Sequence, residues 1–186
     1  RPAGPLREAV RLEDVWFRYD AQLPWVVRGV TLTIPAGTST GLVGLNGAGK
    51  STIVKLLCRF YDPERGRITW DGTDIRELDL AQLRERITAL FQDFVCYELT
   101  AAENIGLGDL SALEERARLA EAARAAGAGT FIDALPRGMD TLLSRVLAPD
   151  TDVDDPEIGT TLSGGQWQRL AIARAAVRTG RDLMIL

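Results

Sequence analysis

The sequence predicts an α/β fold, and three observations support this prediction. First, the stretches 10–17 and 30–34 alternate apolar and polar residues, as antiparallel strands do. Second, the apolar run over 41–44, predicted to be a short buried strand, leads through a glycine-rich loop into a stretch over 49–60 with the spacing of a helix packed on a sheet. Third, from about residue 101 the chain is rich in Ala, Leu, Glu and Arg, which favours helices.

The individual elements follow in chain order. Pro35-Ala36-Gly37 ends the second strand with residues typical of turns. The helix after the glycine-rich loop is expected to bury Ile53, Leu56, Leu57 and Phe60. The elements expected further along are a hairpin over 67–72 that turns at Asp71-Gly72, a short helix over 81–86, a buried strand over 87–91, helical structure from 101 to a cap near Gly127, a helix over 165–177 and the opening of a buried strand over 182–186.

Length and composition are typical of a single domain. A chain of 186 residues is long enough for one α/β core. Its 22 basic and 26 acidic residues give a formal charge of −4 and are interspersed, so we expect no nucleic-acid partner. Because histidine is absent and Cys58 and Cys96 lie far apart, the sequence offers neither a zinc site nor a disulfide framework.

The ends of the chain carry further expectations. No apolar run approaches the roughly 18 residues that a membrane span requires. Two prolines and a glycine within the first five residues indicate a linker, and there is neither an initiator Met nor a signal-peptide pattern. We therefore expect the chain to begin and to end within a longer protein.

The loop Gly44-Leu45-Asn46-Gly47-Ala48-Gly49-Lys50-Ser51 matches the pattern G-x-x-x-x-G-K-S of a P-loop. Its glycines let backbone N–H groups face phosphate oxygens, Lys50 reaches the β and γ phosphates, and the Ser51 hydroxyl holds Mg²⁺. The predicted nucleotide-binding residues here are Gly44, Asn46, Gly47, Ala48, Gly49, Lys50, Ser51 and Thr52.

A second motif, Leu162-Ser163-Gly164-Gly165-Gln166, continues through Trp167, Gln168 and Arg169. Together with the P-loop, it makes the chain from Leu12 to Leu186 resemble the nucleotide-binding domain of ATP-binding-cassette (ABC) transporters. The motif stands where a helix begins, so free N–H groups and a partial positive charge face an anion. In the family this anion is the γ-phosphate held by a second subunit. The resemblance thus implies a head-to-tail dimer around ATP, with these binding residues: Ser163, Gly164, Gly165 and Gln166.

The same resemblance implies a P-loop NTPase fold with a RecA-like core, an antiparallel β subdomain and an α-helical signature subdomain, incomplete at the C-terminus. The corresponding boundaries are 1–9 for the linker, 10–95 for the β subdomain and P-loop core, 96–178 for the helical signature subdomain and 179–186 for the start of the Walker B strand.

Two single residues are assigned by the resemblance. Tyr19 stands where the family carries the aromatic residue that stacks on adenine, although a tyrosine that fills the edge of the core is the alternative. Gln92 ends a predicted buried strand, as the Q-loop glutamine does, and in that place it contacts Mg²⁺ and the γ-phosphate. Further matches to the exporter branch, whose membrane domain precedes the cassette, are Glu103-Asn104-Ile105, the stretch 131–136, Gly138, Asp140-Thr141, Glu157 and Gly159.

The sequence departs from the family in an acidic segment, because 143–155 is longer than expected. Three of its aspartates have the spacing of the first ligands of a calcium-binding EF-hand: Asp150, Asp152 and Asp154. However, Asp155 and Thr161 stand where such a loop needs glycine and glutamate. We therefore expect 149–156 to be a solvated acidic loop, and a regulatory contact there is left open.

A second departure is that the chain ends at the strand after which the family carries the Walker B aspartate, the glutamate that polarises water and the switch histidine. We therefore expect no catalytic residue in this chain, which alone should bind ATP without hydrolysing it. We also expect it to be poorly stable, since the family places a further strand between 41–44 and 182–186.

The favoured interpretation is the ATP-binding and ATP-hydrolysing domain of an ABC exporter at the cytoplasmic face of the cell membrane. It implies ATP and Mg²⁺ as cofactors, and as partners a second nucleotide-binding domain and a transmembrane domain fused N-terminally. Two alternatives remain, a soluble ABC-type ATPase without a membrane domain and a nucleotide-binding module without catalysis. The transported substrate is not identified, because its recognition lies outside the cassette.

Overall fold

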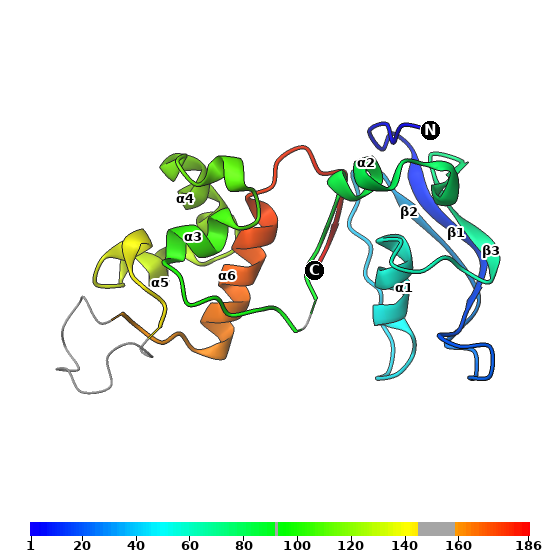
Figure 1. Ribbon diagram of the computed structural model, residues 1–186, viewed down its shortest axis with the longest axis horizontal. Coiled ribbons are helices and arrows are strands. Elements are labelled where there is room, and N and C mark those ends of the chain that lie inside the picture. Colours follow the sequence, from blue (N-terminus) through cyan, green and yellow to red (C-terminus); the bar gives the residue numbers. More distant parts are fainter. Residues whose placement is uncertain (92, 145–158) are drawn as a thin grey trace. The chain divides into compact units, whose positions relative to one another are not determined.

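The structure is a computed structural model that describes residues 1–91, 93–144 and 159–186. The chain divides into two compact units (Figure 1). The first unit comprises Arg1–Ala89 and Gly180–Ile185, and the second comprises Leu90–Thr179 together with Leu186. Tyr19 and the P-loop belong to the first unit and the motif that begins at Leu162 belongs to the second, so the two units are described separately below.

The first unit contains a four-stranded antiparallel sheet in the order β2-β1-β3-β4. Its strands are β1 (Ala9–Phe17), β2 (Val27–Pro35), β3 (Arg65–Trp70) and β4 (Thr73–Asp74). β1 pairs with both β2 and β3, so that Val10 lies opposite Ile34 on one side and Trp70 on the other. The predicted strands and hairpin are confirmed. Asp71 and Gly72 have φ values of 47° and 79°. Two successive positive φ values are typical of the two-residue turn that suits the twist of a hairpin.

The remaining elements of the first unit include a second, two-stranded sheet. They are α1 (Lys50–Leu57), the 3₁₀ turn η1 (Ile75–Glu77), α2 (Leu80–Glu85), β5 (Ile87–Ala89) and β6 (Leu183–Ile185). β5 and β6 pair in parallel, with Ile87 opposite Leu183. This pairing confirms two of the predicted strands and joins segments that are almost a hundred residues apart in the sequence.

The prediction of a buried strand over 41–44 is wrong in this structure. These residues belong to no strand, and Val43 is 94% exposed. A strand is stabilised by neighbours that pair with its backbone, and none of the described strands pairs with this segment. Its apolar side chains therefore remain uncovered in the described residues.

The predicted burial of Phe60 is also wrong, because α1 ends at Leu57 and Phe60 is 50% exposed. Arg59 has a φ of 51°, and the N–H groups of Arg59 and Phe60 donate to the carbonyls of Leu56 and Lys55. These two bonds define a Schellman motif, which reverses the chain at the end of a helix. The reversal takes Phe60 off the face that buries Ile53, Leu56 and Leu57.

The second unit is helical, as predicted, but its helices are shorter than the sequence pattern suggested. They are α3 (Ala101–Gly106), η2 (Leu110–Ala112), α4 (Arg116–Ala125), α5 (Gly129–Asp133), η3 (Gly138–Asp140) and α6 (Gly164–Ala176). Fully buried side chains of Ile105, Leu119, Ile132 and Leu170 meet in its core. α4 ends before Gly127 (φ 67°), which confirms the predicted cap.

No helix in the described ranges is both long and apolar enough to cross a membrane.

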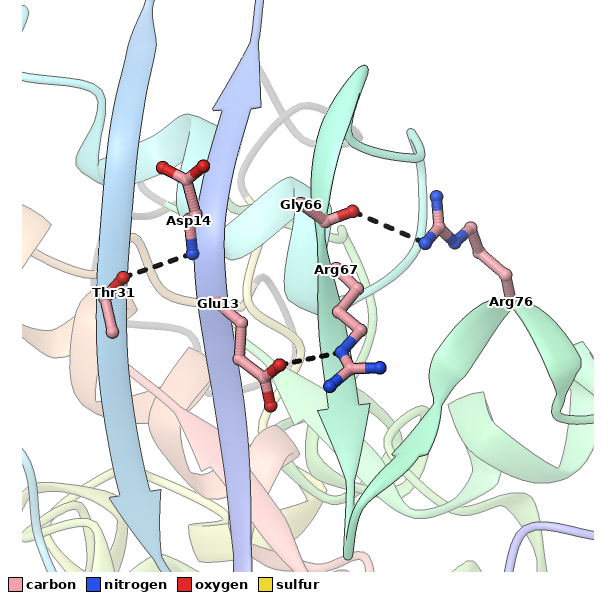
Figure 2. A pocket seen from close by; sticks show the side chains of 6 residues that line it. All are labelled: Glu13, Asp14, Thr31, Gly66, Arg67 and Arg76. Carbon is pink, nitrogen blue, oxygen red and sulfur yellow. Dashed lines mark hydrogen bonds and ion pairs between the residues drawn. The ribbon is translucent and has the colours of Figure 1, made fainter.

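A bulge in β1 lies between two flanking strands (Figure 2). Asp14 has a φ of 48°, and its N–H donates to the Thr31 hydroxyl on β2. On β3, a Cβ atom on Gly66 would lie only 2.2 Å from the Asp14 carbonyl oxygen, so the bulge requires glycine there. The hollow at this place, about 580 Å³, contains none of the predicted site residues, and its charged side chains Glu13 and Arg67 pair with each other at 2.7 Å.

The residues predicted as a linker lie against the first unit. Ala3 is buried, and its carbonyl accepts a hydrogen bond from Arg86 Nε at 2.6 Å. The Asp71 carboxylate accepts from the backbone N–H groups of Arg7, Glu8 and Ala9 at 2.8–3.1 Å. Burial raises the pKa of Asp71, but these donors and the nearby Arg7 charge outweigh it and hold the pKa below its ordinary value.

Asp71→Asn tests this carboxylate, because asparagine tolerates the positive φ of the turn and removes only the charge. A depressed folded-state pKa gives stability that is present at neutral pH and lost as the pH falls through it. We expect Asp71→Asn to lower the free energy of unfolding by about 1 kcal/mol at pH 7, and the difference to shrink below about pH 4. Urea unfolding followed by tryptophan fluorescence measures both. The exposed Asp133→Asn is the control, and an equal deficit at pH 3 and pH 7 would contradict the assignment.

Candidate functional site

The P-loop of the first unit has the backbone that its sequence predicts. Gly47 and Gly49 have φ values of 81° and 85°, in the left-handed region that glycine alone adopts readily. Gly49 is the N-cap of α1 and supplies no side-chain cap to the helix. A Cβ atom at Gly49 would lie 2.9 Å from the carbonyl oxygen of Val26, so this loop position requires glycine on two counts.

The first turn of α1 is open to an anion. The first hydrogen bond within the helix runs from the Ile53 N–H to the Gly49 carbonyl at 2.9 Å. The N–H groups before Ile53 therefore have no acceptor within the helix. The turn contains no acidic residue to offset the helix dipole. Ser51 is exposed and Thr52 is buried. The arrangement matches the chemistry of a phosphate group, with the Ser51 hydroxyl accessible to a metal ion.

Lys50 places a positive charge at the same loop. Its Nζ donates to the carbonyls of Gly44 and Leu45 at 2.6 and 2.8 Å. The loop itself is held by a bond from the Ala48 N–H to the Leu45 carbonyl at 3.1 Å. The ammonium group therefore lies beside the backbone that the motif assigns to phosphate, where it can exchange carbonyl partners for phosphate oxygens.

Tyr19 lies next to α1 in the first unit. Its hydroxyl is 3.0 Å from the Thr52 hydroxyl, and its ring makes edge contacts with Phe17 and Tyr61 at centroid distances of 5.1 and 5.4 Å. Tyr19 remains 43% exposed and is therefore accessible to a ligand. The structure thus brings Tyr19 and the P-loop helix together.

Two residues beside Tyr19 were missed from the sequence. Tyr61 follows α1 directly and is itself 43% exposed, and Lys55 Nζ lies 5.5 Å from the centroid of the Tyr19 ring. The consecutive aromatics Phe60 and Tyr61 after a helix were the signal that could have indicated Tyr61. Nothing in the local pattern distinguishes Lys55 from an ordinary exposed helix residue.

The second motif opens α6 in the second unit. Ser163 is the N-cap, its Oγ accepts from the Gln166 N–H at 3.3 Å, and Gln166 Oε1 accepts from the Ser163 N–H at 2.8 Å. This capping box stabilises the helix start and leaves the N–H groups of Gly164 and Gly165 in its first turn. Both glycines are exposed, and a Cβ atom on either would have open space.

Arg174, three turns further along α6, holds the segment that follows Gln92 in the sequence. Its guanidinium donates to the Asn104 carbonyl and side-chain oxygen at 3.0 and 2.9 Å and to the Val95 carbonyl at 3.1 Å. Asn104 is fully buried and donates in turn to the carbonyls of Tyr97 and Leu99. Asn104, one of the residues that match the exporter branch, therefore has a structural role in this unit.

Some of the predicted site residues are not described by the structure. Gln92 and the segment 145–158, which includes Glu157 and the acidic loop over 149–156, lie outside the described residues. In the described ranges no group of three or more His, Cys, Asp or Glu side chains could form a metal site. The candidate ligand for Mg²⁺ on the described chain is the Ser51 hydroxyl.

Comparison with known proteins gives matches over nearly the whole chain. The family described as ABC transporter matches residues 27–186. The chain is 40% identical over 185 residues to an ATP-dependent lipid A-core flippase from Alkalilimnicola ehrlichii, covering 100% of this chain and 29% of the flippase. It is 41% identical over 177 residues to ABC transporter B family member 28 from Arabidopsis thaliana, covering 95% of this chain and 23% of that protein.

The fold is also similar to that of a solved structure. A bacterial Atm1-family ABC exporter with ATP bound matches with a TM-score of 0.82 and 36% sequence identity, over 98% of this chain and 29% of that chain. These matches confirm the predicted α/β P-loop NTPase fold class. The chain spans less than a third of the length of the curated relatives it matches.

Ser163→Ala tests the start of α6. Loss of the side-chain cap should destabilise the protein by about 1 kcal/mol, and Ser163→Asp should retain most of the stability, since aspartate is also a good N-cap. Thermal unfolding of the three proteins measures this difference. Equal melting temperatures for Ser163→Ala and the unaltered protein would show that the capping box does not stabilise the helix.

Proposed function

The chain belongs to the ABC transporter family, and we propose that it is the nucleotide-binding domain of an exporter that hydrolyses ATP to move a substrate across a membrane. One observation carries most of this proposal. Two exposed helix starts present backbone donors that suit phosphate groups. One is the start of α1, which follows the P-loop, and the other is the start of α6 at Ser163-Gly164-Gly165. The named relatives, a flippase and an exporter, support the transport function.

We assign the nucleotide to the first unit. The triphosphate would contact the P-loop backbone from Gly44 to Gly49, with Lys50 at the β and γ phosphates and Thr52 nearby, and adenine would stack on Tyr19. Ser51, through its hydroxyl, and Gln92 would hold Mg²⁺, which would supply positive charge to the phosphates. The residues fit this use, because the first turn of α1 has free donors, a neighbouring cation and no acid.

We assign two partners to the intact protein. The first is a second nucleotide-binding domain, arranged head to tail. The γ-phosphate of the ATP bound to that domain would lie at the start of α6, against Ser163, Gly164, Gly165 and Gln166. The second is a transmembrane domain, fused N-terminally as in the exporter branch, which would place the chain at the cytoplasmic face of the membrane. Catalytic residues and the exported substrate are expected outside this chain, and nucleic acid is not expected to bind.

Lys50→Ala tests the ATP site. The variant should lower the affinity for Mg²⁺–ATP by about 10-fold or more, because a charge-assisted bond to phosphate contributes roughly 1.5–3 kcal/mol. Titration of the intact protein with a fluorescent ATP analogue measures the dissociation constant. Arg67→Ala, which removes an exposed cation of the same unit, is the control and should bind normally. Unchanged affinity in Lys50→Ala would refute the assignment of the P-loop.

A further inference from the structure

We propose that Arg18 is a positioning residue for nucleobase recognition, because its guanidinium holds the loop over 18–26 in the shape that places Tyr19 beside α1. The inference rests on the proposed function, since it takes Tyr19 as the residue that contacts the base. Arg18 itself would touch neither base nor phosphate. It would act through the loop alone.

The hydrogen bonds to backbone N–H groups within the loop between β1 and β2 lie at its base and at its tip. At its base, the Val26 N–H donates to the Phe17 carbonyl at 2.9 Å. At its tip, the Asp20 carboxylate accepts from the Gln22 N–H at 2.8 Å, and the Asp20 carbonyl accepts from the Leu23 N–H at 3.0 Å. Side chains must therefore order the part of the loop between base and tip.

Arg18 contacts three residues, two of which, Ala21 and Trp25, belong to this loop. Nε and Nη2 donate to the two carboxylate oxygens of Glu64 at 3.0 and 3.2 Å. Nη1 donates to the Ala21 carbonyl at 2.5 Å, and Cζ lies 4.4 Å from the centroid of the Trp25 ring. Only a planar, forked cation can form a bidentate pair, bind a carbonyl and stack on an aromatic ring at once.

Both side-chain partners of Arg18 are themselves fixed to the sheet. The Glu64 N–H donates to the Trp16 carbonyl of β1 at 2.9 Å. The Trp25 ring contacts the Trp16 ring edge-on at 5.6 Å, and Arg65 Cζ lies 5.4 Å from the Trp25 centroid. Through Arg18, the loop is therefore anchored to β1 and β3.

Tyr19, the next residue, makes its contacts with a different set of groups. Its hydroxyl meets Thr52 on α1, and its ring meets Phe17 and Tyr61. Lys50, by contrast, bonds to carbonyls of the P-loop. Because Arg18 orders the loop that carries Tyr19 and contacts neither the P-loop nor α1, its loss should loosen the backbone on which Tyr19 stands, while the phosphate-binding groups keep their partners.

The Arg18–Glu64 pair is too exposed to act mainly on global stability. Its side chains are 25% and 38% exposed, and pairs of this kind contribute little to folding. Loops with few buried contacts order and disorder independently of the core. The effect of Arg18 should therefore appear in base recognition rather than in the melting temperature.

The test compares two ligands of the intact protein, Mg²⁺–ATP and Mg²⁺–tripolyphosphate, which share the phosphate chain and differ in the nucleoside. Isothermal titration calorimetry gives both dissociation constants. Arg18→Ala should weaken ATP about three- to tenfold and change tripolyphosphate by less than about twofold. Combining Arg18→Ala with Glu64→Ala should weaken ATP no further than Arg18→Ala alone, because the two residues act as one unit.

The matched control is Arg67→Ala, which breaks a comparable pair with Glu13 on the same sheet (Figure 2) and should change neither ligand. If Arg18→Ala folds poorly, Glu64→Gln permits the same comparison with the Arg18 side chain retained. An unchanged ratio of ATP to tripolyphosphate affinity in both variants would overturn the proposal, and so would an equal loss for both ligands.

Tyr19→Ala separates this inference from the proposed function. If Tyr19→Ala lowers ATP affinity selectively and Arg18→Ala does not, the Arg18 proposal fails and the base site stands. If Tyr19→Ala leaves the ratio of the two affinities unchanged, the base site is misassigned and both proposals fail. A selective loss in both variants supports both.

Discussion

The close approach of Gly49 to the carbonyl oxygen of Val26 is the constraint on which the candidate nucleotide site depends. A Cβ atom at Gly49 would lie 2.9 Å from that oxygen, and the φ of 85° at Gly49 excludes most other residues. Val26 ends the loop that carries Tyr19, and Gly49 begins the helix that carries Ser51 and Thr52. The segment that leads away from the predicted base site therefore passes directly beside the start of the predicted phosphate site, and glycine at position 49 makes this close approach possible.

The two candidate halves of the site use helix starts in different ways. α1 begins at a glycine that offers no side-chain acceptor, so its first-turn donors stay available and Lys50 adds a positive charge. α6 begins with a capping box in which Ser163 and Gln166 satisfy each other. That box stabilises the helix and still leaves two glycine N–H groups in the first turn, which suits a phosphate group.

Patterns of two to four residues predicted much of the fold, and tertiary contacts account for what they missed. Period-2 alternation located β1 and β2, and the Asp71-Gly72 turn located the hairpin. The exposure of 41–44 could not be predicted, since burial of a strand depends on a paired neighbour. The exposure of Phe60 depends on a left-handed arginine where glycine is usual. The P-loop was evident from its spacing, but the contacts of Tyr61 and Arg18 join segments that are more than forty residues apart.

Photolabelling tests most directly the central claim that this chain binds ATP with its base beside Tyr19. An ATP analogue with an azide on the adenine ring would be irradiated with the intact protein, and the labelled peptides would be identified by mass spectrometry. The account predicts labelling of peptides that contain Tyr19 or Tyr61, suppressed by unlabelled ATP. Labelling confined to other peptides, or undiminished by ATP, would contradict it.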